Sequence, residues 1–107
     1  MTNPDAPILV CIKKPGAKPY VDLVDNTLRA LQQLVGGYIE SFQVASDLTI
    51  LCNEEGLLRG LPFNATICGN PFVGTVVAVG VRGDEFCSIP SAHVPLVLRL
   101  LKGDGVR

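Results

Sequence analysis

The carboxylates that could do chemistry together lie near the ends of two expected strands. Glu40 falls within the stretch 38–42, and Glu54 and Glu55 follow the stretch 48–52. Converging carboxylates can act as general acid and base or hold a metal ion, as a small hydrolase of a nucleotide signal would require. Successive side chains of an extended chain point apart, however, and a turn in water explains Glu54 and Glu55 more simply. The hydrolase is therefore the less favoured alternative.

A second group of side chains suits the recognition of a nucleotide-like ligand. Tyr38 offers a ring face for stacking, Arg59 a charged fork, and Asn64 an amide that both donates and accepts. An alternative for Asn64, which follows Pro62 in an irregular stretch, is that it holds the backbone of its own turn. The predicted ligand-binding residues are Tyr38, Glu40, Asn53, Glu54, Arg59 and Asn64.

Recognisable catalytic and cofactor motifs are missing from the sequence. It has no phosphate-binding loop, no nucleophile elbow and only one histidine, His93. Its cysteines are widely spaced and do not form the close pair that opens a zinc site. We expect no enzymatic activity, no metal, no cofactor, and four reduced thiols of which at least two are buried: Cys11, Cys52, Cys68 and Cys87.

The composition is that of a folded domain. Of the 107 residues, 48% are hydrophobic and 18% charged, and the net charge is −1. Duplex nucleic-acid binding needs a basic face, which this balance does not supply. The apolar runs are too short to cross a membrane, and the first residues lack the pattern of a signal peptide. We expect one domain over residues 1–107, with a loose lead-in at 1–7, located in the cytoplasm.

Apolar patterning predicts the elements that would position these side chains. Strands are expected at 8–12, 20–24, 38–42, 48–52 and 74–81. A first helix would begin at a cap formed by Asp25 or Asn26 and end at Gly36-Gly37. A second helix is expected over 91–102, with Pro95 in its first turn. The predicted fold class is α+β, a mostly antiparallel sheet with about two helices packed on one face.

The second expected helix carries more apolar surface than a helix packed on one sheet needs. Its apolar residues span nearly twice the arc of about 100° that such a helix buries. Leu96 and Leu100 form the excess flank. We expect a homo-oligomer in which these leucines are covered by a second copy, unless a loop within 62–73 covers them instead.

Three short stretches of the sequence resemble a known family. They are Val35-Gly36-Gly37-Tyr38-Ile39-Glu40, Cys52-Asn53-Glu54-Glu55-Gly56, and Leu61-Pro62 followed by Asn64. In this order they are similar to small proteins of phages, plasmids and other mobile elements, a family described only as a domain of unknown function. The likeness covers residues 8–81 and is looser over 82–107. It implies a phage or mobile-element setting and no particular activity.

The candidate side chains and this resemblance together favour a non-enzymatic small-molecule binding module. Its expected role is to sequester a nucleotide-like host defence signal in the host cell cytoplasm. Some small phage proteins counter host defence in this way, which is an analogy of genomic setting and not of chemistry. The alternative is a protein–protein inhibitor that blocks a host defence protein directly.

Overall fold

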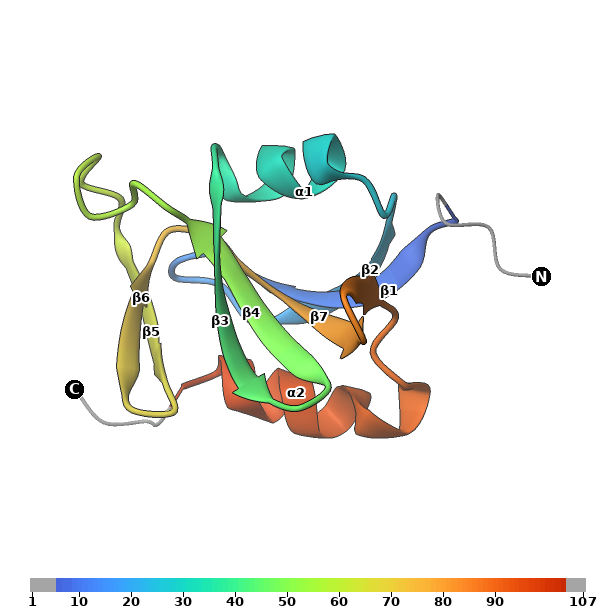
Figure 1. Cartoon of the computed structure of the whole chain (residues 1–107). Coiled ribbons are helices and arrows are strands. Elements are labelled where there is room, and N and C mark those ends of the chain that lie inside the picture. The colour runs from blue at the N-terminus through green and yellow to red at the C-terminus, as the bar shows by residue number, and fades with distance from the viewer. Residues whose placement is uncertain (1–5, 104–107) are drawn as a thin grey trace.

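The main sheet is antiparallel throughout, with strand order β2-β1-β7-β4-β3 and a short strand β8 beside the end of β7 (Figure 1). This computed structural model describes residues 6–103, so most of the lead-in expected at 1–7 lies outside the described residues. The strands of this sheet are β1 (Ile8–Lys13), β2 (Tyr20–Val24), β3 (Ile39–Ala45), β4 (Leu48–Asn53), β7 (Val76–Arg82) and β8 (Glu85–Cys87).

Two helices cover opposite faces of this sheet, so the expectation that both pack on one face was wrong (Figure 1). Helix α1 (Leu28–Val35) and helix α2 (Val94–Leu101), which follows the 3-10 turn η1 (Ser91–His93), enclose separate hydrophobic clusters. Alternate β7 side chains supply both clusters, Val77 and Val79 toward α1 and Val76 and Ala78 toward α2. An unbroken apolar strand run is typical of such two-sided burial, and the α+β class itself is confirmed.

The ends of α1 follow capping chemistry with one correction to the expected start. Thr27 is the N-cap, not Asp25 or Asn26, and its hydroxyl accepts from the Ala30 amide at 3.1 Å. The amide of Asn26 instead donates to the Phe86 carbonyl at 3.0 Å. At the other end Gly36 adopts φ +83°, the left-handed cap that the glycine pair predicted.

A second sheet, the hairpin of β5 (Phe63–Ile67) and β6 (Asn70–Val73), was not predicted from the sequence. Pro62 and Pro71 argued against strands here, because proline lacks the backbone N–H that donates a hydrogen bond in a regular β-ladder. Its two-residue turn has positive φ at both positions, Cys68 at +52° and Gly69 at +78°, as a type I′ hairpin turn requires, but cysteine is uncommon at the first of them. The hairpin stands at one end of the main sheet, across from β3 (Figure 1).

None of the helices within residues 6–103 is long and apolar enough to cross a membrane.

Candidate functional site

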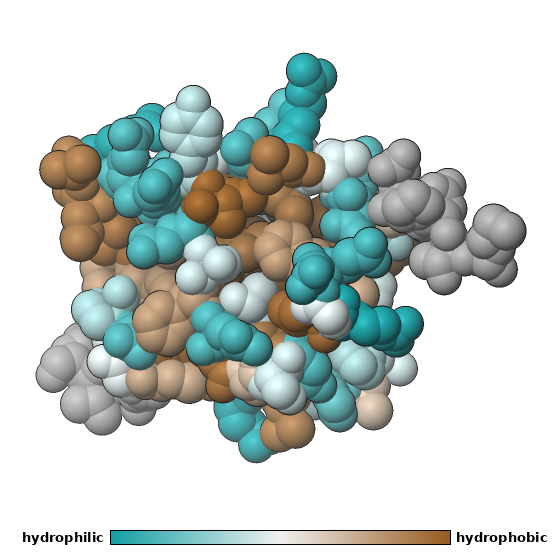
Figure 2. Space-filling model, in the orientation of Figure 1, coloured by the Kyte–Doolittle hydropathy of each residue, from teal (hydrophilic) through white to brown (hydrophobic). Residues whose placement is uncertain are grey.

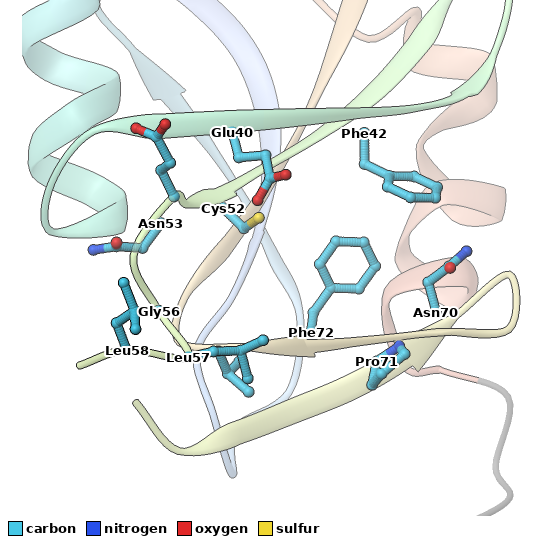
Figure 3. Close-up of a pocket in the computed structure, with 12 residues that line it drawn as sticks. Glu40, Phe42, Cys52, Asn53, Gly56, Leu57, Leu58, Asn70, Pro71 and Phe72 are labelled. Carbon is cyan, nitrogen blue, oxygen red and sulfur yellow. The ribbon is translucent and has the colours of Figure 1, made fainter. Parts of the chain in front are cut away.

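An open cavity of about 520 Å³ separates the β3–β4 pair from β6 of the hairpin (Figure 3). The turn segment 54–60, which links β4 to β5, closes one end of it. Three regions of the chain therefore meet at this cavity. Its lining residues are Glu40, Phe42, Cys52, Asn53, Glu54, Gly56, Leu57, Leu58, Asn70, Pro71, Phe72 and Val73.

Strand register explains why Glu40, Phe42 and Cys52 share this cavity. Glu40 and Phe42 are two residues apart on β3 and so point to the same face. Cys52 lies directly across from Glu40 in the register of β3 and β4. Phe72 on β6 faces Phe42 in an edge-to-face contact, with ring centroids 5.7 Å apart and an interplanar angle of 85° (Figure 3). The sheet and the hairpin thus contribute opposite walls.

Leu57 and Leu58 form an apolar rim at the closed end of the cavity. They are 83% and 89% exposed, the largest exposed fractions among the exposed large hydrophobic residues. Figure 2 shows apolar surface gathered where Figure 1 places this turn segment. Two adjacent leucines therefore leave a contiguous apolar patch exposed to water beside the cavity.

The charge inside the cavity is negative. Glu40 and Glu54 line it, whereas none of its lining residues is lysine or arginine. Partial burial raises the pKa of the Cys52 thiol, and the nearby carboxylate of Glu40 raises it further. Cys52 is therefore a protonated, weakly nucleophilic thiol near neutral pH, and it lines the cavity as an apolar group.

Asn53 and Arg59 anchor the turn segment to the end of α1. The Asn53 amide donates to the Val35 carbonyl at 3.1 Å, and its oxygen accepts from the Glu55 amide at 2.8 Å. Arg59 Nη1 donates to the Gly36 carbonyl at 2.9 Å. These contacts satisfy two carbonyls at the end of α1, which a helix leaves without partners.

Two glycines of the same stretches allow the anchored segments to approach closely. A Cβ on Gly37 would lie 3.0 Å from Asn53 Nδ2 and 3.2 Å from Arg59 Nη1. A Cβ on Gly56 would lie 2.8 Å from Val73 Cγ2. The stretches 35–40 and 52–56 therefore contribute structure as well as cavity lining.

Asn64 lies away from the cavity lining, in a buried hydrogen-bond network with Lys13. Lys13 Nζ donates to Asn64 Oδ1 at 2.9 Å. The Asn64 amide donates to the Lys13 carbonyl at 2.8 Å and to the Gly74 carbonyl at 2.7 Å. Both amide atoms are thus engaged, and they tie β5 to the main sheet.

The structure brings together three of the six predicted site residues. Glu40, Asn53 and Glu54 line the cavity, whereas Tyr38, Arg59 and Asn64 do not. The sequence reasoning missed the aromatic and apolar lining, above all Phe42, Phe72 and the Leu57–Leu58 rim. The adjacent leucines in a turn-rich segment were the available signal. Over residues 6–103, no group of three or more His, Cys, Asp or Glu side chains converges as a metal site would require.

Comparison with known proteins places the chain in a family without assigning an activity. Neither the curated proteins nor the solved structures offer a match to it. A family model described as a domain of unknown function, DUF3846, matches residues 8–102, which include every strand and helix given above. The chain therefore belongs to the DUF3846 family.

Proposed function

We propose that this protein is a non-enzymatic binding module whose guest occupies the cavity between β3, β4 and β6. The observation that carries the proposal is the cavity itself, about 520 Å³ in volume and walled by Phe42 and Phe72. Binding sites for small molecules are concave, mostly apolar and equipped with a few polar groups. The Leu57–Leu58 rim enlarges the apolar surface that a guest would cover.

The lining favours a guest with an apolar body and a neutral or positively charged end. Glu40 offers an acceptor beside the aromatic wall, and a cation next to it would form a charge-assisted hydrogen bond. Phosphate groups would meet Glu40 and Glu54 with no lysine or arginine in the lining. Sequestration of a nucleotide-like signal therefore has weaker support from this cavity than binding of an amine or a neutral aromatic group.

The biological setting of the proposal rests on the sequence resemblance alone. This setting has three parts. The protein would be encoded by a phage or mobile element, would act in the host cytoplasm, and would counter host defence. The protein–protein inhibitor has support from one observation, the exposed leucine rim beside the cavity. The small hydrolase has the least support, since Glu40 and Glu54 line the cavity but Glu55, the third carboxylate considered for it, does not.

We also propose that the protein forms a homo-oligomer through α2. The exposed apolar surface of α2 is smaller than the sequence suggested, because it does not include both Leu96 and Leu100. Leu96 is 61% exposed, whereas Leu100 is partly buried against the cluster beneath α2. Leu96 also lines a second cavity of about 170 Å³ between α2 and the β3–β4 turn. The support for an oligomer therefore lies with Leu96.

Thermal-shift screening with three classes of probe tests the proposal. The probes are aromatic amines, neutral aromatics of the same size, and nucleoside phosphates. At equal probe concentrations we expect the amines to stabilise the protein most, and a probe at a hundredfold excess over its dissociation constant should add about 2.7 kcal/mol. Glu40→Gln should remove the preference for amines, whereas Glu85→Gln, a control at an exposed position outside the cavity lining, should retain it. Stabilisation by nucleoside phosphates alone would refute the proposed guest chemistry, and no stabilisation by any class would refute the binding site.

A further inference from the structure

The outer edge of β3 presents a row of free main-chain groups. The Glu54 amide donates to the Tyr38 carbonyl at 2.8 Å, which continues the ladder of β4 with β3. Because bonded pairs alternate in an antiparallel ladder, Glu40 and Phe42 direct their backbone groups toward β4. The backbone groups of Ile39, Ser41 and Gln43 therefore point away from the sheet.

The other side of β4 supports this alternation independently. The Val81 amide donates to the Asp47 carbonyl at 2.9 Å, so the odd-numbered residues of β4 pair with β7. Ile50 and Cys52 are then left to pair with Phe42 and Glu40 of β3. No group within the described residues 6–103 pairs with the outward backbone groups of β3.

The two edges of the main sheet differ in their protection. On β2, the opposite edge, the Leu23 amide is occupied by the Asp22 carboxylate at 2.8 Å. A side chain that occupies an edge donor discourages pairing with another strand. Ser41 and Gln43 on β3 are exposed, and neither is charged or proline. Among the described residues, no side chain occupies an outward amide of β3 in this way, so the edge beside the cavity is open to an added strand.

An added strand would also reach the cavity with its side chains. In antiparallel pairing, its residue opposite Ser41 would exchange two hydrogen bonds with Ser41. The two flanking residues would lie opposite Glu40 and Phe42, with their side chains on the cavity face. A basic side chain would then meet Glu40, and an apolar one would lie beside the rings of Phe42 and Phe72.

We propose that β3 pairs with an extended peptide segment whose basic and apolar residues are separated by one position. This inference rests on the proposed function and names its guest as a peptide of a partner protein. Strand addition of this kind takes affinity from the main chain and specificity from alternate side chains. Charge favours such a segment over a second copy of this chain, which would bring another Glu40 to the edge and no cation.

Hydrogen exchange with a defined peptide tests the proposal. The probe is the capped heptapeptide Thr-Val-Leu-Ser-Lys-Val-Thr, whose central serine would lie opposite Ser41. We expect the amides of Ile39, Ser41 and Gln43 to exchange rapidly in the free protein and to slow when the peptide is added. Methylation of the central serine nitrogen should weaken binding by about tenfold or more, because that nitrogen faces β3. Methylation of the backbone nitrogen of the lysine, which faces away from β3, should have little effect.

Two variants of the protein give a matched comparison. Ser41→Pro removes an outward donor without removing a bond to β4, and it should abolish peptide binding. Ser41→Ala retains the donor and should bind as the native protein does. If Ser41→Pro fails to fold, the pair of methylated peptides still decides the question.

The outcomes separate this inference from the proposed function. Aromatic amines that bind in the cavity, with no amide protection at peptide concentrations up to about 1 mM, would overturn strand addition and leave the binding module standing. Failure of both probes would overturn both. Protection of the same three amides by self-association at high protein concentration, with no peptide present, would assign the edge to a second copy and overturn the peptide proposal.

Discussion

The ring of Phe42 on β3 meets the ring of Phe72 on β6 edge to face, with centroids 5.7 Å apart. Phe72 is buried within the α2-side cluster, whereas Phe42 is partly exposed at the cavity. The pair thus joins the hydrophobic core to the candidate site. A guest in the cavity would extend this aromatic contact without rearranging the core.

Asn64→Ala should strongly destabilise the fold. The substitution leaves Lys13, which is 8% exposed, without its side-chain acceptor, and it leaves two carbonyls without their donor. We expect a loss of about 3 kcal/mol or more in the free energy of unfolding, measured by urea denaturation. Asn70→Ala removes a single exposed hydrogen bond and should cost less than about 1 kcal/mol. Similar stability of the two variants would show that the Lys13–Asn64 network is not structural.

Gly37→Ala should loosen the turn segment at the end of α1. The added methyl would crowd Asn53 and Arg59 and displace the hydrogen bonds that they donate to the helix carbonyls. We expect a destabilisation of about 1–2 kcal/mol in urea unfolding, with faster exchange of the amides of 54–60. Combining Gly37→Ala with Arg59→Ala should cost less than the sum of the two single changes, because both disrupt one contact. If the destabilisation of the double variant equals the sum of the two single changes, the methyl of Gly37→Ala does not crowd Arg59.

Alkylation of the free cysteines should follow their exposure, and the raised pKa values of Cys11 and Cys52 should slow these two further. At pH 8 we expect Cys68 to react first, Cys52 slowly, and Cys11 only on unfolding. Burial raises the pKa of Cys11 from its usual 9.0 to about 11, so this thiol stays protonated. Between pH 9 and 11 the folded state therefore binds more protons than the unfolded state, and the free energy of unfolding should fall as the pH rises. Mass spectrometry of peptides from iodoacetamide-treated protein gives the order, and early labelling of Cys11 would contradict it.

Leu96→Glu should convert an oligomer held by α2 into monomers without unfolding the protein, because Leu96 is already largely exposed. Light scattering at micromolar concentration measures the mass before and after the change. Leu100→Glu is a poorer test, since Leu100 packs against the hydrophobic cluster and its loss should lower stability directly. A native protein that scatters as a monomer would refute this oligomer.

Local patterning was sufficient to predict most of the main sheet and both helices. The run Ile8–Ile12 and the glycine cap at Gly36 determine their elements with little help from the rest of the chain. Local patterning could not predict the sheet face on which each helix packs, because β7 is apolar on both sides and indicates no preferred face.

The candidate site was harder to predict because its walls come from distant parts of the sequence. Phe42 and Phe72 are brought together only by the hairpin, whose turn places Cys68 in a conformation that non-glycine residues rarely adopt. Asn64 was predicted to bind a ligand because its side chain is polar, but its amide forms hydrogen bonds with Lys13 inside the protein. Some polar side chains of the motif stretches therefore line the cavity, and others form hydrogen bonds that hold the surrounding segments together.

Mapping amide chemical shifts during titration with phenethylamine tests the central claim most directly. This probe has an aromatic body and a cationic end, the two features of the proposed guest. The account predicts saturable shifts at Glu40, Cys52, Leu57 and Phe72, with those of Arg82 and Leu96 unchanged. It also predicts that Glu40→Gln weakens binding while Glu85→Gln does not. Shifts that are absent, or that centre on α2 and leave the cavity residues unmoved, would contradict the assignment of this cavity as the binding site.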